Sequence, residues 1–344
     1  MKALRIYGPC DMRYETVPTP APGPGEVLAR VHSVGLCRTD IEVYENRLYH
    51  YKIGKAMLPV IPGHEWAGVA EELGPGVTDL ALGDRITCET ALGCGHCQLC
   101  LSGHQNICQD RIENGIINRN GAMAEFIVAP RSTTHRIGDL PFDSGAFIEP
   151  AAVCTYAVKT GRVCPADSVL VLGAGPIGQL LTQIAKAYGA RQVVTVARKE
   201  SKLELARGLG ADATISSGSE DLGEAAMALT DGLGFNVMLE AAGSAPLLEQ
   251  AMGAVAVRGR IVLTGSYVGA LASLDPDVIV CRELSVAGTV GGEACYEEAI
   301  GLLRSGKVQV EPLTSDRRPL SDAVAVFESL AEGAGQSVKV IFHP

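Results

Sequence analysis

The sequence lacks the features that mark a membrane-spanning, exported or nucleic-acid-binding chain. No uninterrupted apolar run reaches the roughly 18 residues that a bilayer-spanning helix needs. Residues 1–10 contain neither an apolar signal core nor a cleavage pattern. No run is rich in lysine and arginine, and the formal net charge is −10. We therefore expect a cytoplasmic protein that binds neither a membrane nor a nucleic acid.

The chain also lacks the pattern of a disulfide framework, although it contains 11 cysteines among 344 residues. An odd count in a long chain without an export signal favours metal ligation and buried thiols over disulfides. The length is sufficient for two domains, and the 47% of apolar residues is ample for their cores.

A strand, a glycine turn and a helix stand at the centre of the chain. Val169–Leu172 is a short apolar run, typical of a strand buried on both faces. Gly173, Gly175 and Gly178 follow as Gly-x-Gly-x-x-Gly, and residues 179–188 have helical apolar spacing. In this context the glycines form a tight turn, admit a pyrophosphate and let the helix pack on the strand. The pattern predicts a nucleotide-binding site, and a tight turn in another kind of α/β domain is the alternative.

The two halves of the chain have different patterns. Before residue 150 we expect little helix and strands at 2–7, 26–34, 68–73, 85–89 and 124–128. From residue 151 helix and strand signals alternate, which predicts βαβ units around a parallel sheet. The expected helices cover 151–160, 199–209, 221–229 and 246–255, and the expected strands cover 192–196, 213–216, 237–240, 260–263 and 284–288. We expect the last 50 or so residues, with helices at 296–305 and 321–331 and a strand at 336–342, to return to the β domain.

Four closely spaced cysteines form one candidate metal site. They are Cys94, Cys97, Cys100 and Cys108. Four thiolates at this spacing can enclose Zn²⁺ in a tetrahedron that has no open position, which is typical of a structural site. Clustered free thiols or disulfides are the alternative.

A second candidate set is dispersed along the chain. It comprises Cys37, His64, Glu65 and Glu149, which offer sulfur, nitrogen and oxygen ligands. A mixed set that leaves one position open suits a catalytic zinc. For His64 considered alone, a buried structural histidine is the alternative.

The motifs of this chain resemble those of the zinc-dependent medium-chain alcohol dehydrogenases, and they occur in the same order. They are Cys-Arg-Thr-Asp at 37–40, Gly-His-Glu-Trp-Ala-Gly at 63–68, the four-cysteine loop, Gly-Ala-Met-Ala-Glu-Phe at 121–126, Glu-Pro at 149–150 and the glycine turn. The Glu-Pro pair is most similar to the polyol and threonine dehydrogenase branch. The resemblance implies an α/β chain with a GroES-like β-rich catalytic domain at 1–150, completed by 286–344. It also implies a doubly wound Rossmann domain at 151–285, with the active site in the cleft between the domains.

The resemblance further implies two zinc ions per chain. The catalytic zinc would bind Cys37, His64 and Glu65, with Glu149 as an alternate or more distant ligand. The four-cysteine loop would hold the structural zinc. Thr39 would carry away the proton of the substrate hydroxyl, because a hydroxyl can accept and donate at once.

Glu42 departs from the family pattern. It stands three residues after Thr39, where many relatives have a histidine that passes the proton to solvent. Glu42 either continues the proton relay or is a solvated surface acid. A relay through a cofactor ribose hydroxyl and water is a further possibility.

The end of the second Rossmann strand bears on the choice of cofactor. An acidic residue there binds the adenosine ribose in NAD-binding units, whereas this chain has Ala197 followed by Arg198 and Lys199. A missing carboxylate and two cations predict a preference for NADP(H) over NAD(H). The alternative is that these cations begin a solvated helix and that Glu200 neutralises them.

Other cofactor contacts follow from the resemblance. Pro176 and Ile177 belong to the glycine turn, and Gly265–Ser266 and Gly291–Gly292 fall where the family's loops meet the nicotinamide. Ordinary turn glycines are the alternative for both pairs.

The implied function is an oxidoreductase. It would transfer a hydride between a nicotinamide cofactor and a small secondary alcohol, and the oxidised product would be a ketone. The alcohol would be a polyol, sugar, aminocyclitol or amino alcohol. Residues 44–52 are polar and aromatic and are expected to line the substrate cleft. The alternatives are a zinc-independent quinone or enoyl reductase and a non-catalytic nucleotide-sensing relative.

We also expect a homodimer or a homotetramer. The family usually pairs through the outer strand of the Rossmann sheet, here at residues 284–288. Leu284, Val286 and Ala287 would form an apolar edge there, and such an edge favours pairing with a second copy.

Overall fold

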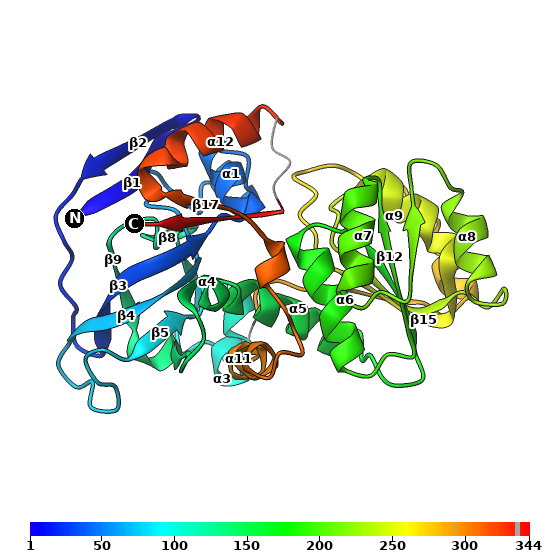
Figure 1. Ribbon diagram of the computed structural model, residues 1–344, viewed down its shortest axis with the longest axis horizontal. Helices are drawn as coiled ribbons and strands as arrows, with labels where there is room; N and C mark the ends of the chain where they lie inside the picture. Colours follow the sequence, from blue (N-terminus) through cyan, green and yellow to red (C-terminus); the bar gives the residue numbers. More distant parts are fainter. Residues whose placement is uncertain (293, 334–337) are drawn as a thin grey trace. The chain divides into compact units, whose positions relative to one another are not determined.

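The computed structural model describes residues 1–292, 294–333 and 338–344 (Figure 1). The chain divides into two compact units, each assembled from separate segments. The first unit consists of Met1–Pro150, Gly291–Arg304 and Leu313–Pro344, and the second consists of Ala151–Val290 and Ser305–Pro312. The chain therefore passes from one unit to the other at four points along its length.

A seven-stranded sheet forms the centre of the first unit. Its strand order is β10-β5-β4-β3-β18-β17, and β9 also pairs with β3. These strands are β3 (Glu26–Gly35), β4 (Glu65–Leu73), β5 (Arg85–Cys88), β9 (Phe126–Pro130), β10 (Thr134–Arg136), β17 (Thr314–Pro319) and β18 (Lys339–His343). β18, red in Figure 1, pairs antiparallel with the blue β3, so the last strand of the chain completes a sheet built by early strands.

Shorter elements surround this sheet. Apolar side chains of β3, β4, β9 and β18, among them Val34, Trp66, Ile127 and Phe342, form its buried core. The other strands of the unit are β1 (Lys2–Gly8), β2 (Asp11–Thr16), β6 (Ala91–Leu92), β7 (Ile112–Asn114) and β8 (Asn118–Arg119). The helices are α1 (Arg38–Tyr44), α2 (Tyr49–Lys52), α3 (Gln98–Leu101), α4 (Phe142–Gly145), α11 (Tyr296–Arg304) and α12 (Ala323–Ala331).

The second unit is built on a six-stranded parallel sheet of order β13-β12-β11-β14-β15-β16. Its strands are β11 (Ser168–Leu172), β12 (Gln192–Ala197), β13 (Ala213–Ser216), β14 (Phe235–Glu240), β15 (Val255–Leu263) and β16 (Ser285–Gly288). Every residue of β11 is buried, as its apolar sequence predicts. This strand order is that of the dinucleotide-binding fold, which confirms the predicted α/β fold class.

Helices cover both faces of the parallel sheet. They are α6 (Pro176–Ala187), α7 (Glu200–Gly208), α8 (Leu222–Ala228), α9 (Ala245–Ala251) and α10 (Pro276–Cys281). In Figure 1, α6 and α7 lie on one side of β12, and α8 and α9 lie on the other. The remaining helix, α5 (Ile148–Thr160), begins in the first unit and continues into the second.

Some elements differ from the sequence predictions. The helix expected at 246–255 ends as α9 at Ala251, and Val255 begins β15, because the β-branched residues after Gly253 favour a strand. The strand expected at 124–128 begins only at Phe126. The short helices α1 to α4 lie in a region where little helix was expected, and tertiary contacts rather than local sequence hold such short helices.

Two predictions near the end of the chain also differ from the structure. Leu284 is only 8% exposed and packs into the core of the second unit, so its expected place on an exposed edge is wrong. The closing strand expected at 336–342 corresponds to β18, which begins at Lys339. Gln336 and Ser337, which were expected to begin that strand, lie outside the described residues.

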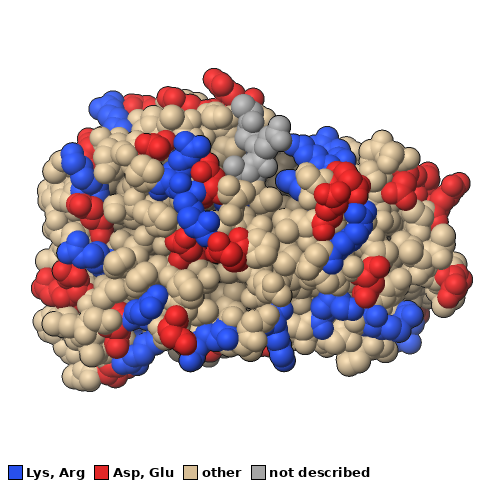
Figure 2. Space-filling view, in the orientation of Figure 1, with Lys and Arg blue, Asp and Glu red and all other residues tan. Residues whose placement is uncertain are grey.

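The surface carries charges of both signs. On the face shown in Figure 2, basic and acidic side chains are interspersed among the described residues. In the described part of the chain, no helix combines the length and apolar character needed to cross a membrane.

Candidate functional site

The side chains of Cys37, His64 and Glu65 meet in the first unit. One ligand atom from each lies within 4.8 Å of the others. His64 and Glu65 are 4% and 1% exposed. Sulfur, imidazole nitrogen and carboxylate oxygen are donors that zinc accepts, and three of them leave the fourth tetrahedral position open. The donor set therefore fits a metal ion that can also bind a substrate or water.

Local backbone features bring these three residues together. Cys37 directly precedes α1, and Glu65 is the first residue of β4. Gly63, immediately before His64, has a φ of +96°, and a Cβ on it would lie 2.9 Å from the Met123 backbone nitrogen. Only glycine fits this left-handed and crowded position.

Asp40, a fully buried residue of α1, orients the candidate ligands. Its carboxylate accepts hydrogen bonds from the backbone N–H groups of Cys37 at 2.9 Å and Gly63 at 3.1 Å. His64 Nδ1 lies 3.4 Å from the same carboxylate, which leaves Nε2 as the ring nitrogen for a metal. Sequence reasoning assigned Asp40 no role, because the contact with Gly63 exists only in the folded chain.

Lys339 of β18 lies against the same cluster. Its ammonium group forms an ion pair with the Glu65 carboxylate, and the two side chains are 3% and 1% exposed. Burial acts to lower the pKa of the Lys339 amine, but the neighbouring negative charges, with Glu65 the largest, raise it above its ordinary value. No local pattern around Lys339 could have identified this role.

Glu149, near the start of α5, stays outside the three-residue cluster. Its Oε1 accepts a hydrogen bond from Thr90 Oγ1 at 3.3 Å. Burial raises the pKa of the Glu149 carboxyl to about 7, the charge of Glu65 adds to this effect, and the positive charges of His64 and Lys339 oppose it. Glu149 is therefore close enough to sense these charges without joining the ligand cluster.

Thr39 and Glu42 lie one helical turn apart on α1. Thr39 is half-buried. Glu42 is 1% exposed, with its carboxylate 4.0 Å from the Arg38 guanidinium. The alternative in which Glu42 is a solvated surface acid is therefore wrong.

The four-cysteine loop gathers its sulfurs into one cluster. The Sγ atoms of Cys94 and Cys100 lie 3.9 Å apart, and those of Cys97 and Cys108 lie 3.7 Å apart. Tetrahedral zinc with Zn–S bonds of ~2.3 Å would place sulfurs about 3.8 Å apart, so the spacing fits this ion. Backbone N–H groups of Cys97 and Cys100 also point at Sγ atoms, which favours thiolates. All 11 cysteines are free, so the disulfide alternative is wrong.

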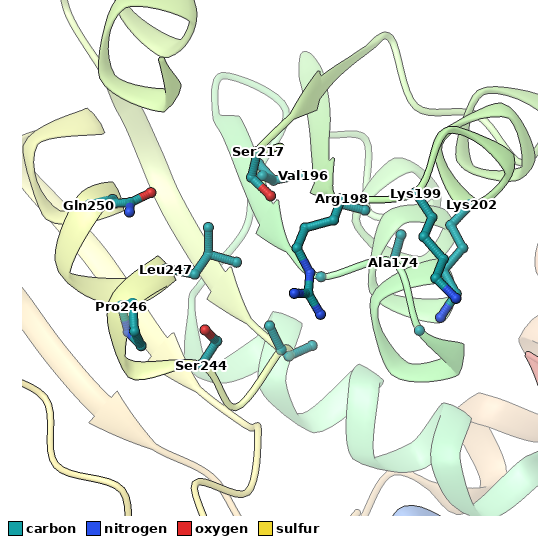
Figure 3. A pocket seen from close by; sticks show the side chains of 15 residues that line it. Ala174, Val196, Arg198, Lys199, Lys202, Ser217, Ser244, Pro246, Leu247 and Gln250 are labelled. Atoms are coloured by element: carbon teal, nitrogen blue, oxygen red, sulfur yellow. The ribbon is translucent and has the colours of Figure 1, made fainter. Parts of the chain in front are cut away.

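A cavity of about 860 Å³ opens in the second unit beside the glycine turn, and we call it the glycine-turn pocket. It lies at the carboxyl ends of parallel strands, where such sheets bind their ligands. Of the predicted cofactor residues, the lining includes Gly173, Gly175, Ala197, Arg198 and Lys199. It also includes residues that were not predicted, among them Lys202, Ser217, Ser244, Leu247 and Gln250 (Figure 3). Lys202 could have been found from its helical spacing to Lys199.

The three glycines of the turn have different structural surroundings. Gly173 has a φ of +99°. A Cβ on Gly178 would lie 1.8 Å from the Gly173 carbonyl oxygen, so the helix can approach the strand only with glycine there. A Cβ on Gly175 would meet no described atom within 4 Å. Protein packing therefore does not require Gly175, whereas the close approach of a ligand would.

Other predicted cofactor residues do not line the glycine-turn pocket. Pro176 and Ile177 form the first turn of α6. A helix N-terminus can bind a phosphate through its backbone N–H groups, although Pro176 itself has none. A Cβ on Gly265, which precedes Ser266, would lie 2.6 Å from the Gly243 backbone nitrogen. Gly291 and Gly292 line a cavity of about 20 Å³ in the first unit.

The cations of the glycine-turn pocket have no carboxylate partner among the described residues. They are Arg198, Lys199 and Lys202. Figure 3 shows the Arg198 side chain extending into the pocket. Glu200, which was considered as their neutralising partner, instead pairs with Arg207 at 2.7 Å. Burial lowers the pKa of the Lys202 amine, and the charges of the other two cations lower it further.

Comparison with known proteins extends these observations. Two family models match the chain, the alcohol dehydrogenase GroES-like domain at residues 23–139 and the zinc-binding dehydrogenase domain at residues 176–305. Sorbitol dehydrogenase of Halalkalibacterium halodurans is 31% identical over 351 residues, covering 100% of this chain and 99% of that protein. L-threonine 3-dehydrogenase of Pyrococcus abyssi is 34% identical over 347 residues, covering 99% and 97%. A protein from Sinorhizobium meliloti 1021, solved with NADP bound, has a TM-score of 0.93 and 32% identity, covering 100% and 99%.

A dinucleotide-binding sheet and two metal-ligand clusters in one chain define a metal-dependent dehydrogenase. The chain belongs to the zinc-dependent medium-chain alcohol dehydrogenase family, which confirms the resemblance of its motifs. It is an oxidoreductase that transfers a hydride between an alcohol and a nicotinamide cofactor. Both ligand clusters are assembled, which argues against the zinc-independent reductase alternative.

Proposed function

We propose that this chain is an NADP(H)-preferring dehydrogenase of a secondary alcohol in a polyol, sugar, aminocyclitol or amino alcohol. The observation that carries the cofactor preference is the set of Arg198, Lys199 and Lys202, which lines the glycine-turn pocket without a carboxylate partner among the described residues. The 2′-phosphate of NADP(H) supplies the negative charge that such a set pairs with. The similar S. meliloti structure, which contains NADP, supports this preference. The relatives named for sorbitol and L-threonine support the substrate class.

The proposal includes two zinc ions per chain. Cys37, His64 and Glu65 hold the catalytic ion, and Glu149 serves as an alternate or more distant ligand. The structural ion is held by Cys94, Cys97, Cys100 and Cys108. The spacing of the donor atoms in both clusters supports these assignments. When bound, the catalytic zinc supplies a Lewis acid that lowers the pKa of the substrate hydroxyl, and the nicotinamide accepts the hydride.

Side chains of α1 carry the proton of the substrate hydroxyl away. The Thr39 hydroxyl accepts that proton while it donates its own, and Glu42 receives it one helical turn further on. The position of Glu42 supports this path, because it lies on the same face of α1 as Thr39 and 4.0 Å from the solvent-exposed Arg38 side chain, beside which the proton can pass to water.

Other residues hold the ligands without touching the substrate. Asp40 sets the orientation of Cys37 and His64, and Lys339 fixes one oxygen of Glu65. Partners of this kind preserve ligand geometry, and their removal weakens metal binding or activity by about 10- to 100-fold in metalloproteins.

We assign the catalytic domain to residues 1–150 and 286–344, and the nucleotide-binding domain to residues 151–285. The unit boundary after Pro150 supports this division. The structural units differ from it at residues 286–290, which include most of β16 of the parallel sheet, and at Ser305–Pro312, which belong to the second unit.

The functional form in this proposal is a homodimer or a homotetramer. β16 is the last strand of its sheet, so its outer edge has no partner strand in the described part of the chain. Val286 on that strand is 42% exposed. An exposed apolar edge of this kind favours pairing with a second copy.

The experiment that tests the proposal compares kcat/KM for NADP and NAD. A panel of polyols, sugars and amino alcohols first identifies a good substrate. We expect the wild-type protein to prefer NADP, and Arg198→Ala to lower kcat/KM for NADP about tenfold or more, since a charge-assisted contact is lost. The value for NAD should change about twofold or less. Arg207→Ala is the matched control, because Arg207 pairs with Glu200 outside the pocket. A wild-type preference for NAD contradicts the proposal.

A further inference from the structure

A buried glutamine lies between the glycine turn and α7. Gln179 of α6 has 0% exposure. Its Nε2 donates a hydrogen bond to the Lys202 backbone carbonyl at 2.8 Å and a longer one to the Ala174 carbonyl at 3.4 Å. Ala174 and Lys202 both line the glycine-turn pocket. One side-chain amide therefore connects two walls of that pocket.

The amide of Gln179 can take only one orientation here. Both groups beside it are carbonyl oxygens, so the NH₂ group must face them. The other end of the amide, Oε1, is buried without a hydrogen-bond partner among the described residues. An unpaired buried acceptor is destabilising, and an apolar side chain of similar size would avoid this. The benefit of glutamine at this position must therefore come from what Nε2 holds.

The segment that Nε2 holds carries like charges. Lys202 lies in the first turn of α7, and Lys199 and Arg198 directly precede the helix. Their mutual repulsion acts to move them apart, and burial of the Lys202 amine adds to the strain. A hydrogen bond from the well-packed α6 to the Lys202 backbone opposes this movement. Ala174, Ala197 and Leu203 form a small apolar cluster at the same place.

We propose that Gln179 is a positioning residue for cofactor selectivity. It holds the first turn of α7 so that its cations face the 2′-phosphate of NADP(H). This inference rests on the proposed NADP(H) preference. The pyrophosphate is common to both cofactors, whereas only NADP(H) carries a charge at the adenosine ribose, so loosening α7 weakens NADP(H) binding selectively.

The test measures binding rather than turnover. Dissociation constants for NADPH and NADH are determined by nucleotide fluorescence titration of the zinc-loaded protein. Gln179→Leu should raise the NADPH constant about five- to tenfold, as the loss of one hydrogen bond implies, and the NADH constant about twofold or less. Gln183→Leu is the matched control. Gln183 lies one turn further along α6 and is 4% exposed, but it hydrogen-bonds the Gln309 backbone instead, so neither constant should change selectively.

A double-mutant cycle tests whether Gln179 acts through α7. In a Lys202→Met background, Gln179→Leu should lose most of its effect on NADPH, because the cation that it positions is gone. Equal weakening of NADPH and NADH, or no change in either, overturns the inference. Gln179→Met replaces the leucine variant if that one does not fold. Failure of both to fold while Gln183→Leu folds would show a purely structural role, which also overturns it. A wild-type protein that binds NADH more tightly refutes the proposed cofactor preference instead.

Discussion

At the candidate catalytic site, buried charges hold one another in place. Asp40, Glu65 and Lys339 are almost completely buried, and each has a partner within the cluster. Removing one member of such a set leaves another charge uncompensated, which typically costs about 3–5 kcal/mol. The candidate ligand side chains are therefore held in place by the protein itself.

The hydroxyl of Thr39 is expected to be essential for turnover. Thr39→Ala should lower kcat about 10²-fold or more, the range that positioned proton-transfer groups supply. Thr39→Ser keeps the hydroxyl and should retain most activity. Steady-state kinetics at saturating cofactor provide the measurement. A near-normal kcat for the alanine variant would show that the Thr39 hydroxyl does not carry the proton.

The sequence was sufficient to predict the candidate ligands but not the residues that orient them. Cys37, His64 and Glu65 stand in short motifs, and the folded chain brings their donor atoms together. Lys339 and Gln179 act through partners that are distant in sequence or belong to the backbone. No periodicity or spacing encodes such contacts, so only the folded arrangement could identify them.

Among the elements, the four-cysteine loop is the one that we expect to depend most on the proposed structural zinc. It has only a four-residue helix, α3, and a short 3₁₀ turn between its first and last cysteine. Little hydrophobic core is available to such a segment, so we expect metal ligation to supply most of its stability.

Substitution of a ligand should therefore impair folding in the four-cysteine loop and turnover at the candidate catalytic site. Cys97→Ser is expected to reduce the yield of folded protein and lower Tm markedly, since structural zinc contributes on the order of 10 kcal/mol in isolated peptides. His64→Ala should abolish turnover and leave a folded chain. Elemental analysis should find about two zinc ions per active wild-type chain and about one in His64→Ala. Fewer than two in the active wild type would contradict both roles.

α11 is fastened to the first unit by a histidine that bridges two acids. His135 Nε2 lies 3.0 Å from Glu89, its Nδ1 lies 2.6 Å from Glu297, and its ring stacks on Tyr296 at 5.2 Å. Burial acts to lower the pKa of His135, but the two carboxylates raise it above its ordinary value. Both ring nitrogens face carboxylate oxygens, so the ring, when protonated, can donate to both and connect α11 to β10 and Glu89.

The sign of the resulting pH dependence is determined by the raised pKa of His135. The stabilisation is fully present below the unfolded-state pKa near 6.5 and is lost as pH rises through the folded-state pKa. His135→Gln should thus lower Tm by a few degrees at pH 6 and by less at pH 9. Glu297→Gln, which removes one of the two acids, should show the same trend. Equal losses at both pH values would exclude a charged bridge.

Elements of the second unit were easier to predict than those of the first. The apolar runs and helical spacing around β11 and α6 are determined locally, whereas α1 depends on Asp40, whose carboxylate also binds the Gly63 backbone. Similarly, α9 and β15 share an apolar stretch, and the helix stops where the chain must rejoin the sheet.

For the molecule as a whole, we expect the edge strand β16 to govern self-association. Val286→Lys places a charge on that exposed edge, and lysine at such positions blocks edge pairing. We expect light scattering to show a dimer or tetramer for the wild type and a particle near the 36.0 kDa chain mass for the variant. Leu82→Lys, at an exposed site in the first unit, should leave the assembly unchanged. A wild-type particle of single-chain mass at micromolar concentration would contradict this expectation.

The pairing of β18 with β3 has a consequence for folding during synthesis. Gly35 pairs with Ile341, so the ribosome must translate past Ile341 before the central sheet of the first unit can close. Until then the Glu65 carboxylate lacks the ammonium group of Lys339. The second unit draws most of its residues from one continuous segment and can fold earlier. A chain terminated before β18 would thus be able to form its nucleotide-binding sheet but would lack the Lys339–Glu65 ion pair beside the candidate metal ligands.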